Sequence, residues 1–180
     1  MSQTRIRRKD RAVYDDAWIE DFLKNAPVIT VGFTDGQQPF IKPTLFVYDP
    51  GRHAVYFHAT EFGRTTEMLK AHPQAALTAF EMGRLLPAKR AMDFSLEYAS
   101  VVAYGEIAVI EDEDEAIHGL QLLLDKYFPH LKPGEDYAPT QPVELKVTAV
   151  FRLDIREWAG KQKKVDEDFP DAFHFPIPNP

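Results

Sequence analysis

Alternating hydrophobic and polar positions recur along most of the chain and predict β-strands joined by short turns. The clearest case lies in residues 143–158, where Val147, Ala149, Phe151, Leu153 and Ile155 fall at every second position. This period is typical of a strand with one buried face. Five more strands are expected at 28–34, 39–48, 54–60, 74–82 and 97–110.

Turn residues and breaks within these segments indicate how the strands are connected. Asp35-Gly36 and Asp49-Pro50-Gly51 separate the first three strands and predict hairpin turns. Gly105 interrupts the strand at 97–110 and predicts a bulge or bend. A proline inside the segment Lys42-Pro43-Thr44 predicts an edge strand or a bulge, where backbone groups are free to meet a ligand.

Apolar residues at helical spacing predict three helices. One begins at an Asp15-Asp16 cap and ends at Pro27, and one spans 64–71. The acidic run 111–115 precedes the third helix, where its carboxylates suit the helix dipole. The residues expected to face inward are Trp18, Ile19, Phe22, Leu23, Met68, Leu69, Ile117, Leu120, Leu123, Leu124 and Tyr127. About six strands with hairpin connections and three helices predict a mainly β (α+β) fold, an antiparallel sheet or barrel with peripheral helices.

The chain divides into an arm, one domain and a tail. Residues 1–14 form a basic arm, with Arg5, Arg7, Arg8, Lys9 and Arg11 opposed by Asp10. A solvated or partner-wrapping terminus is the favoured interpretation. Residues 15–164 are expected to form a single folded domain. Residues 165–180 end in FPDAFHFPIPNP, which is too rich in proline to predict regular structure.

Composition narrows the possible functions. A net charge of −7 argues against general nucleic-acid binding, and no apolar run is long enough to span a membrane. The absence of cysteine excludes disulfides, thiolate metal sites and a cysteine nucleophile, so a cytoplasmic location is expected. The six histidines are scattered, and no metal site is expected. Signatures of nucleophilic or hydrolytic catalysis are also missing.

The stretch 55–69, VYFHATEFGRTTEML, carries the most informative chemistry. A strand leads through a short loop with one glycine into a helix that begins with Arg64. Backbone amides, hydroxyls and a guanidinium at a helix entrance are suited to hold a phosphate monoester. Arg64 is either this clamp, the interpretation we favour, or a helix-surface cation. His58 is either a hydrogen-bonded residue at a barrel rim or a proton donor beside a cofactor.

Three pieces of the sequence together resemble a known family. These are YFHAT…GRTTEML, GRLLPAKRAMDFSLEYASVVAYGEI and the closing WAGK. In order and spacing they are similar to the FMN-binding split-barrel proteins related to pyridoxamine 5′-phosphate oxidase, in the flavin-nucleotide-binding branch that includes the nitroimidazole-resistance (Nim) group. The resemblance implies a six-stranded antiparallel split β-barrel. It also implies a homodimer with one FMN in each of two clefts at the subunit interface.

The resemblance also assigns residues to the FMN site. It places His58, Ala59 and Thr60 along the cofactor, and Gly63, Arg64 and Thr65 at its phosphate. Lys42, Pro43 and Thr44 would offer main-chain groups to the polar edge of the flavin ring. From the other subunit, Ser100 would stand where the oxidases place a flavin-contacting glutamine. Trp158 and Lys161 would close the site near the same cleft. His58 is the implied catalytic residue, because the Nim branch has a functional histidine there.

Departures from the family pattern shape the functional expectation. Thr65 stands where many relatives have a second cation, so Lys42, Arg84 or Lys89 would have to complete the neutralisation of the phosphate. No counterpart of the oxidase's substrate-phosphate residues is present, and vitamin B6 oxidation is not supported. We expect a flavin-dependent oxidoreductase that passes electrons from a small donor to a nitro compound, quinone or flavin. The alternatives are a non-catalytic flavin-binding or storage module and a haem-binding split barrel, with His174 or His58 as axial ligand.

Overall fold

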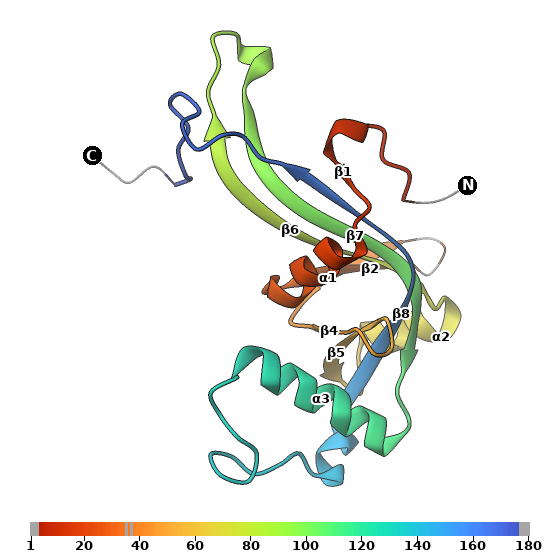
Figure 1. The fold of residues 1–180 in the computed structure, drawn as a ribbon. Helices are drawn as coiled ribbons and strands as arrows, with labels where there is room; N and C mark the ends of the chain where they lie inside the picture. The colour runs from red at the N-terminus through yellow and green to blue at the C-terminus, as the bar shows by residue number, and fades with distance from the viewer. Residues whose placement is uncertain (1–3, 35, 37, 177–180) are drawn as a thin grey trace.

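One strongly curved antiparallel sheet dominates the computed structural model, which describes residues 4–34, 36 and 38–176 (Figure 1). The strands run in the order β3-β2-β6-β7-β8-β5-β4, and β1 pairs with β8. Their bounds are β1 Ala12–Val13, β2 Ile29–Thr34, β3 Pro39–Thr44, β4 Val47–Asp49, β5 Ala54–Thr60, β6 Gln74–Leu86, β7 Ser95–Val109 and β8 Thr148–Lys163. The helices are α1 Asp16–Asn25, α2 Arg64–Ala71 and α3 Glu113–Tyr127, with short 3-10 turns η1 Lys9–Arg11, η2 Ala91–Asp93 and η3 Pro142–Lys146.

The expected split-barrel fold is confirmed, but the described chain has eight strands where six were predicted. The expected strand at 39–48 is in fact two. β3 pairs with β2 at one edge of the sheet, whereas β4 pairs with β5 at the other edge. Between them the Tyr127 hydroxyl hydrogen-bonds to both the amide and the carbonyl of buried Phe46. A side chain thus replaces the strand partner that Phe46 lacks, and the break is stable.

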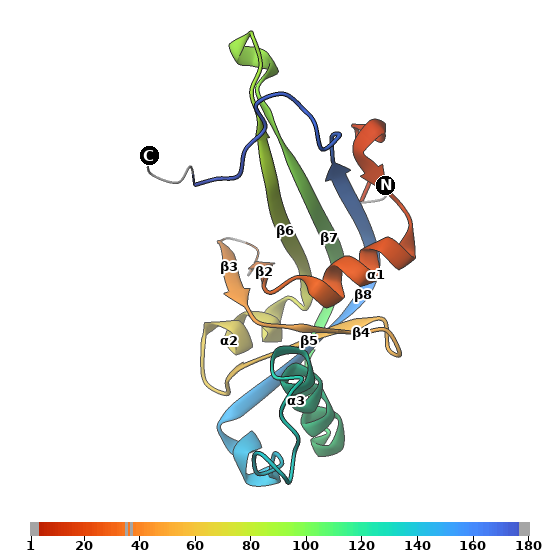
Figure 2. The same cartoon turned by 60° about the vertical axis from the view of Figure 1, so that its left-hand side comes forward.

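The last strand also differs from its prediction. β8 begins at Thr148 and not at 143, because Gln141 and Glu144 form a capping box that starts η3. Val147 is consequently 69% exposed and takes no part in the alternation. β8 continues to Lys163 beside the long strands β6 and β7, which rise together as a protruding hairpin (Figures 1 and 2).

A bulge at Gly105 is confirmed by a shift in the β7–β8 register between Tyr104 and Gly105. A Cβ at Gly105 would lie 2.0 Å from the Asp154 carbonyl oxygen, closer than any side chain tolerates. Of the other turns, Asp49-Pro50-Gly51 lies between β4 and β5 as predicted. Asp35 lies outside the described residues, and Gly36 has a φ of +89°.

Helices cover the sheet at three places and fix its buried faces. Asp15 caps α1 by accepting a hydrogen bond from the Ala17 amide, and Ile19 and Leu23 enter the main core. Asp112 caps α3 in the same way, and the acidic residues that follow it lie in the first turn of the helix, as predicted. α3 buries Leu123 as predicted and also Ala116 and Gly119, which were not predicted. The remaining residues predicted to face inward from α3 are only partly buried. Among the described residues no helix is long and apolar enough to cross a membrane.

The C-terminal tail lies against the β6–β7 hairpin (Figure 1). Leu85 and Phe173 exchange backbone hydrogen bonds as an isolated antiparallel bridge. Arg84 donates two bonds to the carboxylate of Glu97, at 2.8 and 2.9 Å, and others to the carbonyls of Val165, Asp166 and Glu167. The first part of this proline-rich segment therefore has a defined path without regular secondary structure.

Candidate functional site

The predicted phosphate loop joins β5 to α2 with the predicted bounds of both elements. The Thr60 hydroxyl donates to the Phe62 carbonyl at 3.1 Å and closes the loop. Gly63 is the N-cap of α2 in an extended conformation, and no side chain of the described residues caps the helix. The first amides of α2 are therefore without a side-chain acceptor, which is the condition for holding an anion. Thr65, in the first turn, is buried.

Arg64 is held over the edge strand β3. Its guanidinium carbon lies 4.8 Å from the centre of the Phe40 ring, a cation–π contact. Arg64 makes no ion pair with a carboxylate among the residues that the structure describes. The guanidinium thus keeps hydrogen-bond donors that an incoming anion could engage.

β3 is the first strand of the sheet, as the proline in Lys42-Pro43-Thr44 predicted for an edge or a bulge. Figure 2 shows the chain leaving β3 beside α2 and continuing into β4. Lys42 makes no ion pair with a described residue either. The edge strand β3 therefore lies close to β5 and α2, and it carries the ammonium group of Lys42, which pairs with no described carboxylate.

His58 lies on β5, between the buried residue Phe57 and the loop, and its side chain is exposed. Partial desolvation of the ring lowers the pKa of His58, and the positive charge of Lys42 lowers it further. The imidazole is consequently neutral at pH 7, able to donate one hydrogen bond and to accept a proton. Ala59 and Thr60 follow it toward the loop and pair with Ala149 and Thr148 of β8.

Ser100, expected from a second subunit, and Trp158 and Lys161, expected to close the site, lie on β7 and β8 away from the phosphate loop. Ser100 and Lys161 are paired across β7 and β8, and together with the arm residues Thr4, Arg5 and Ile6 they line one hollow of about 120 Å³. Trp158 is not with them. Its ring packs against His53 at 4.4 Å, and its indole nitrogen donates to Asp16 at 2.8 Å. Because successive residues of a strand point to opposite faces, Trp158 faces the core while Lys161 faces the hollow.

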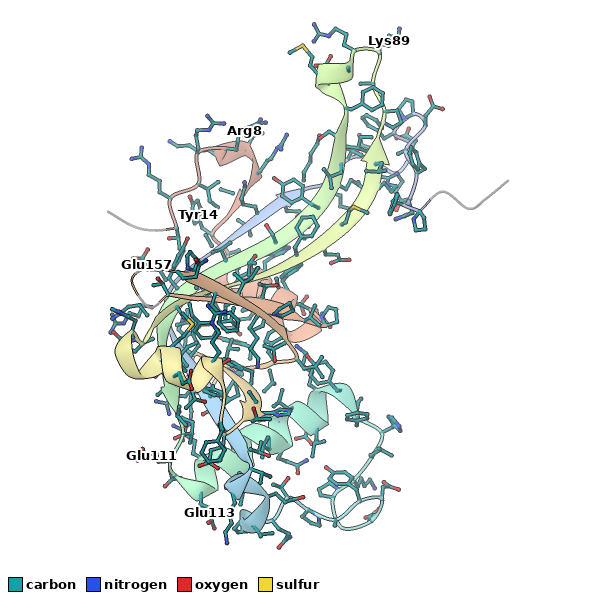
Figure 3. The ribbon with its side chains drawn as sticks, turned by 180° about the vertical axis from the view of Figure 1, so that it is seen from behind. Arg8, Tyr14, Lys89, Glu111, Glu113 and Glu157 are labelled. Carbon is teal, nitrogen blue, oxygen red and sulfur yellow. The ribbon has the colours of Figure 1, made fainter. Side chains whose placement is uncertain are left out.

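The three candidates for a second phosphate cation occupy different regions. Arg84 binds Glu97 and the tail, so its donors are already used. Lys89 lies at the far tip of the β6–β7 hairpin (Figure 3). Lys42 lies close enough to His58 to influence its pKa. The Arg64–Phe40 contact was missed in the sequence, because it depends on how β3 folds back toward α2.

Comparison with known proteins identifies the family of this fold. The sequence profile of pyridoxamine 5′-phosphate oxidase matches residues 15–162. The chain belongs to this family. No curated protein matches it.

Solved structures share the fold over most of the chain. The flavocytochrome Anf3 from Azotobacter vinelandii is 25% identical with a TM-score of 0.78, and the match covers 100% of this chain and 88% of that one. A FAD and heme binding protein from Mycobacterium smegmatis is 21% identical with a TM-score of 0.75, over 89% and 76% of the two chains. A putative 5-nitroimidazole antibiotic resistance protein from Bacteroides thetaiotaomicron is 22% identical with a TM-score of 0.69, over 84% and 86%.

Proposed function

We propose that this family member binds FMN where β3, β5 and α2 meet, and that it is a flavin-dependent oxidoreductase acting on a small nitro compound, quinone or flavin. The observation that carries the proposal is the Arg64 guanidinium, which pairs with no described carboxylate, beside the start of α2, which no described side chain caps. Together they would hold the FMN phosphate. The names of the structural relatives, a flavocytochrome and a FAD and heme binding protein, support a flavin as the cofactor.

The residues around this point fit the rest of the cofactor. Lys42, Pro43 and Thr44 lie on an edge strand, where main-chain groups are free to bind the polar edge of the ring. Because Thr65 is uncharged, Lys42 would supply the second positive charge at the phosphate. Bound flavin would carry electrons between a donor and an acceptor. Neutral His58 would then contact the substrate and, after taking up a proton, return it to the reduced product.

A second copy of the chain would complete the site. Lys161 lies thirteen residues beyond Thr148 on β8, about 40 Å along the strand at ~3.3 Å per residue. Ser100 and Lys161 are therefore too far along the sheet from the loop after Thr60 to reach the same flavin within one chain. We infer a homodimer in which the hollow at Ser100 and Lys161 faces the partner's Arg64. The core position of Trp158 gives it a supporting role behind this surface.

The visible absorption spectrum of purified protein, followed by titration with FMN and with FAD, tests the proposal. Near-stoichiometric flavin bands and tighter binding of FMN than of FAD are expected. Loaded protein should be reduced by NADH, NADPH or a deazaflavin donor and reoxidised by a nitro compound, quinone or free flavin. Tight binding without turnover would instead identify a storage module. An unchanged spectrum on titration with either flavin would exclude the cofactor.

A haem-binding function is the second candidate, favoured by the similarity to a flavocytochrome over the whole chain. The two candidate axial ligands, His58 on β5 and His174 in the tail, both have exposed side chains. A Soret band should then form on haem titration and disappear in His58→Ala or His174→Ala. A band that survives both substitutions would remove these two ligands from consideration.

A further inference from the structure

A second hollow lies on the other side of α2 and shares none of the flavin-site residues. Its volume is about 800 Å³, and it is enclosed by α2, the end of β7, the start of α3, and η3. Figure 3 shows Glu111 and Glu113 at this end of the molecule, where β7 passes into α3. A hollow of this size is within the range of small-molecule sites.

The walls of this hollow combine apolar surface with acidic groups. Its apolar part is formed by Leu69, Ile107, Val109, Ala116, Leu145 and Ala149. Phe62 adds an aromatic ring that is 85% exposed. A ring so exposed beside an apolar wall offers area that a ligand could bury.

Charge in the hollow is predominantly negative. Glu61, Glu111 and Glu113 line it, and Lys146 is the one lysine or arginine among the described residues that does so. None of the three carboxylates forms an ion pair with any residue in the described part of the chain. The start of α3 cannot attract an anion here, because Asp112 already caps it and its first turn holds three acidic residues.

Thr66 provides an independent sign of an incomplete contact on the same wall. Its hydroxyl is buried and has no hydrogen-bond partner, the only such side-chain atom in the described residues. Thr66 and Leu69 lie three residues apart on one face of α2, and both line the hollow together with Phe62 from the loop before the helix. A buried hydroxyl without a partner is costly, so this wall carries a polar group that the described residues leave unsatisfied.

We propose that this hollow binds a small amphipathic cation, an organic amine with an apolar body. The body would lie against Phe62, Leu69 and Leu145, and the ammonium group would face Glu111 and Glu113. The inference goes beyond the flavin site, because it uses the opposite side of α2. Since Ala149 is paired with Ala59, the bound amine would lie one strand away from the residue beside His58.

Three probes of equal size and different charge test the proposal: 4-phenylbutylamine, 4-phenylbutanol and 4-phenylbutyrate, each titrated into the full chain by calorimetry at pH 7. The amine is protonated at this pH and the acid is ionised. The amine should bind about tenfold more tightly than the alcohol, the effect of two partly exposed charge pairs. The acid should bind most weakly. Equal affinities, or no binding of the amine, would overturn the proposal.

Variants separate charge from apolar contact. Glu111→Gln with Glu113→Gln should reduce the affinity for the amine to that of the alcohol and leave the alcohol unchanged. Glu81→Gln with Asp114→Asn removes the same charge outside the hollow and should have no effect on either ligand. Phe62→Ala should weaken the binding of both ligands to a similar extent. Because the Phe62 ring is exposed, the substitution should not unfold the protein.

A final control distinguishes this site from the flavin site. Arg64→Ala should weaken FMN binding and leave the amine affinity unchanged. Saturating FMN should likewise not displace the amine. Displacement of the amine by FMN would place the probe in the flavin cleft and overturn the assignment of a second site.

Discussion

Arg64 and Arg84 each follow a glycine, and the structure uses the two side chains in opposite ways. Arg84 lies against Glu97 and three carbonyl groups of the tail, so its donors are engaged within the chain. Arg64 lies over the ring of Phe40, and no carboxylate among the described residues pairs with it. The same dipeptide therefore forms a structural clamp at one end of the sheet and a free cation at the other.

The difference shows which cation is available to a ligand. A guanidinium that already binds a carboxylate in a bidentate manner would have to lose those bonds before it could hold a phosphate. Arg64 loses at most a cation–π contact, which is worth about 0.5–1 kcal/mol at an exposed site. Arg84 is thus a poor candidate for the second phosphate cation, and Lys42 is the better one.

Alanine substitution of each arginine tests most directly which of the two side chains binds FMN. Arg64→Ala should weaken FMN binding by about 1.5–3 kcal/mol, the contribution of a charge-assisted hydrogen bond. That is roughly a tenfold to hundredfold rise in the dissociation constant, measured by quenching of flavin fluorescence. Arg84→Ala should leave this constant unchanged. Equal losses in the two variants would mean that the phosphate does not depend on Arg64.

The same pair of variants should give the reverse result for the tail. Arg84→Ala removes the donors that fix Val165, Asp166 and Glu167. We expect the amides from 165 to 173 to exchange hydrogen much faster, and a protease to cut there before it cuts the sheet. Mass spectrometry of exchanged or digested protein measures both effects. Unchanged protection in Arg84→Ala would assign the path of the tail to the Leu85–Phe173 bridge alone.

How well the sequence predicts the contacts of each arginine depends on how far apart along the chain the contacting residues lie. The bounds of β5 and α2 follow from local alternation, capping and a glycine, and they match the structure. Arg84 and Glu97 meet because β6 and β7 pair in one particular register. The register of β6 and β7 cannot be predicted from the local sequence pattern. The sequence alone therefore leaves Arg84 as a candidate for the phosphate.

The break between β3 and β4 shows a second limit. Residues 39–48 have the composition of one continuous strand, and local pattern favours that interpretation. The structure divides them because Tyr127, from a helix far along the chain, binds the backbone of Phe46. This division places Lys42 at the edge of the sheet, near His58. The edge position of the proline was predictable, whereas the approach to β5 was not.

Acid should release the Arg84 clamp in a defined pH range. The Arg84 guanidinium, together with the Val165 amide, lowers the pKa of Glu97 from about 4.5 to about 2. A lowered carboxylate pKa stabilises the folded state in full above about pH 4.5, and the contribution is lost as pH falls toward 2. Denaturant unfolding of wild type and Glu97→Gln should converge across this range. A constant difference between the two curves would contradict the ion pair.

The smallest expected effect is a change in the pKa of His58, on the strand that leads to Arg64. Lys42→Met removes a positive charge that lowers the pKa of His58, so the pKa of His58 should rise toward its ordinary value. Partial desolvation remains in the variant, so the recovery should be incomplete. Titration of the imidazole signals by NMR measures the shift, with Lys146→Met as a control that removes a lysine on the far side of α2. A pKa that moves equally in both variants would reflect the total charge of the protein. A shift confined to Lys42→Met would establish that β3 and β5 meet at His58, which is the contact that a flavin at this edge requires.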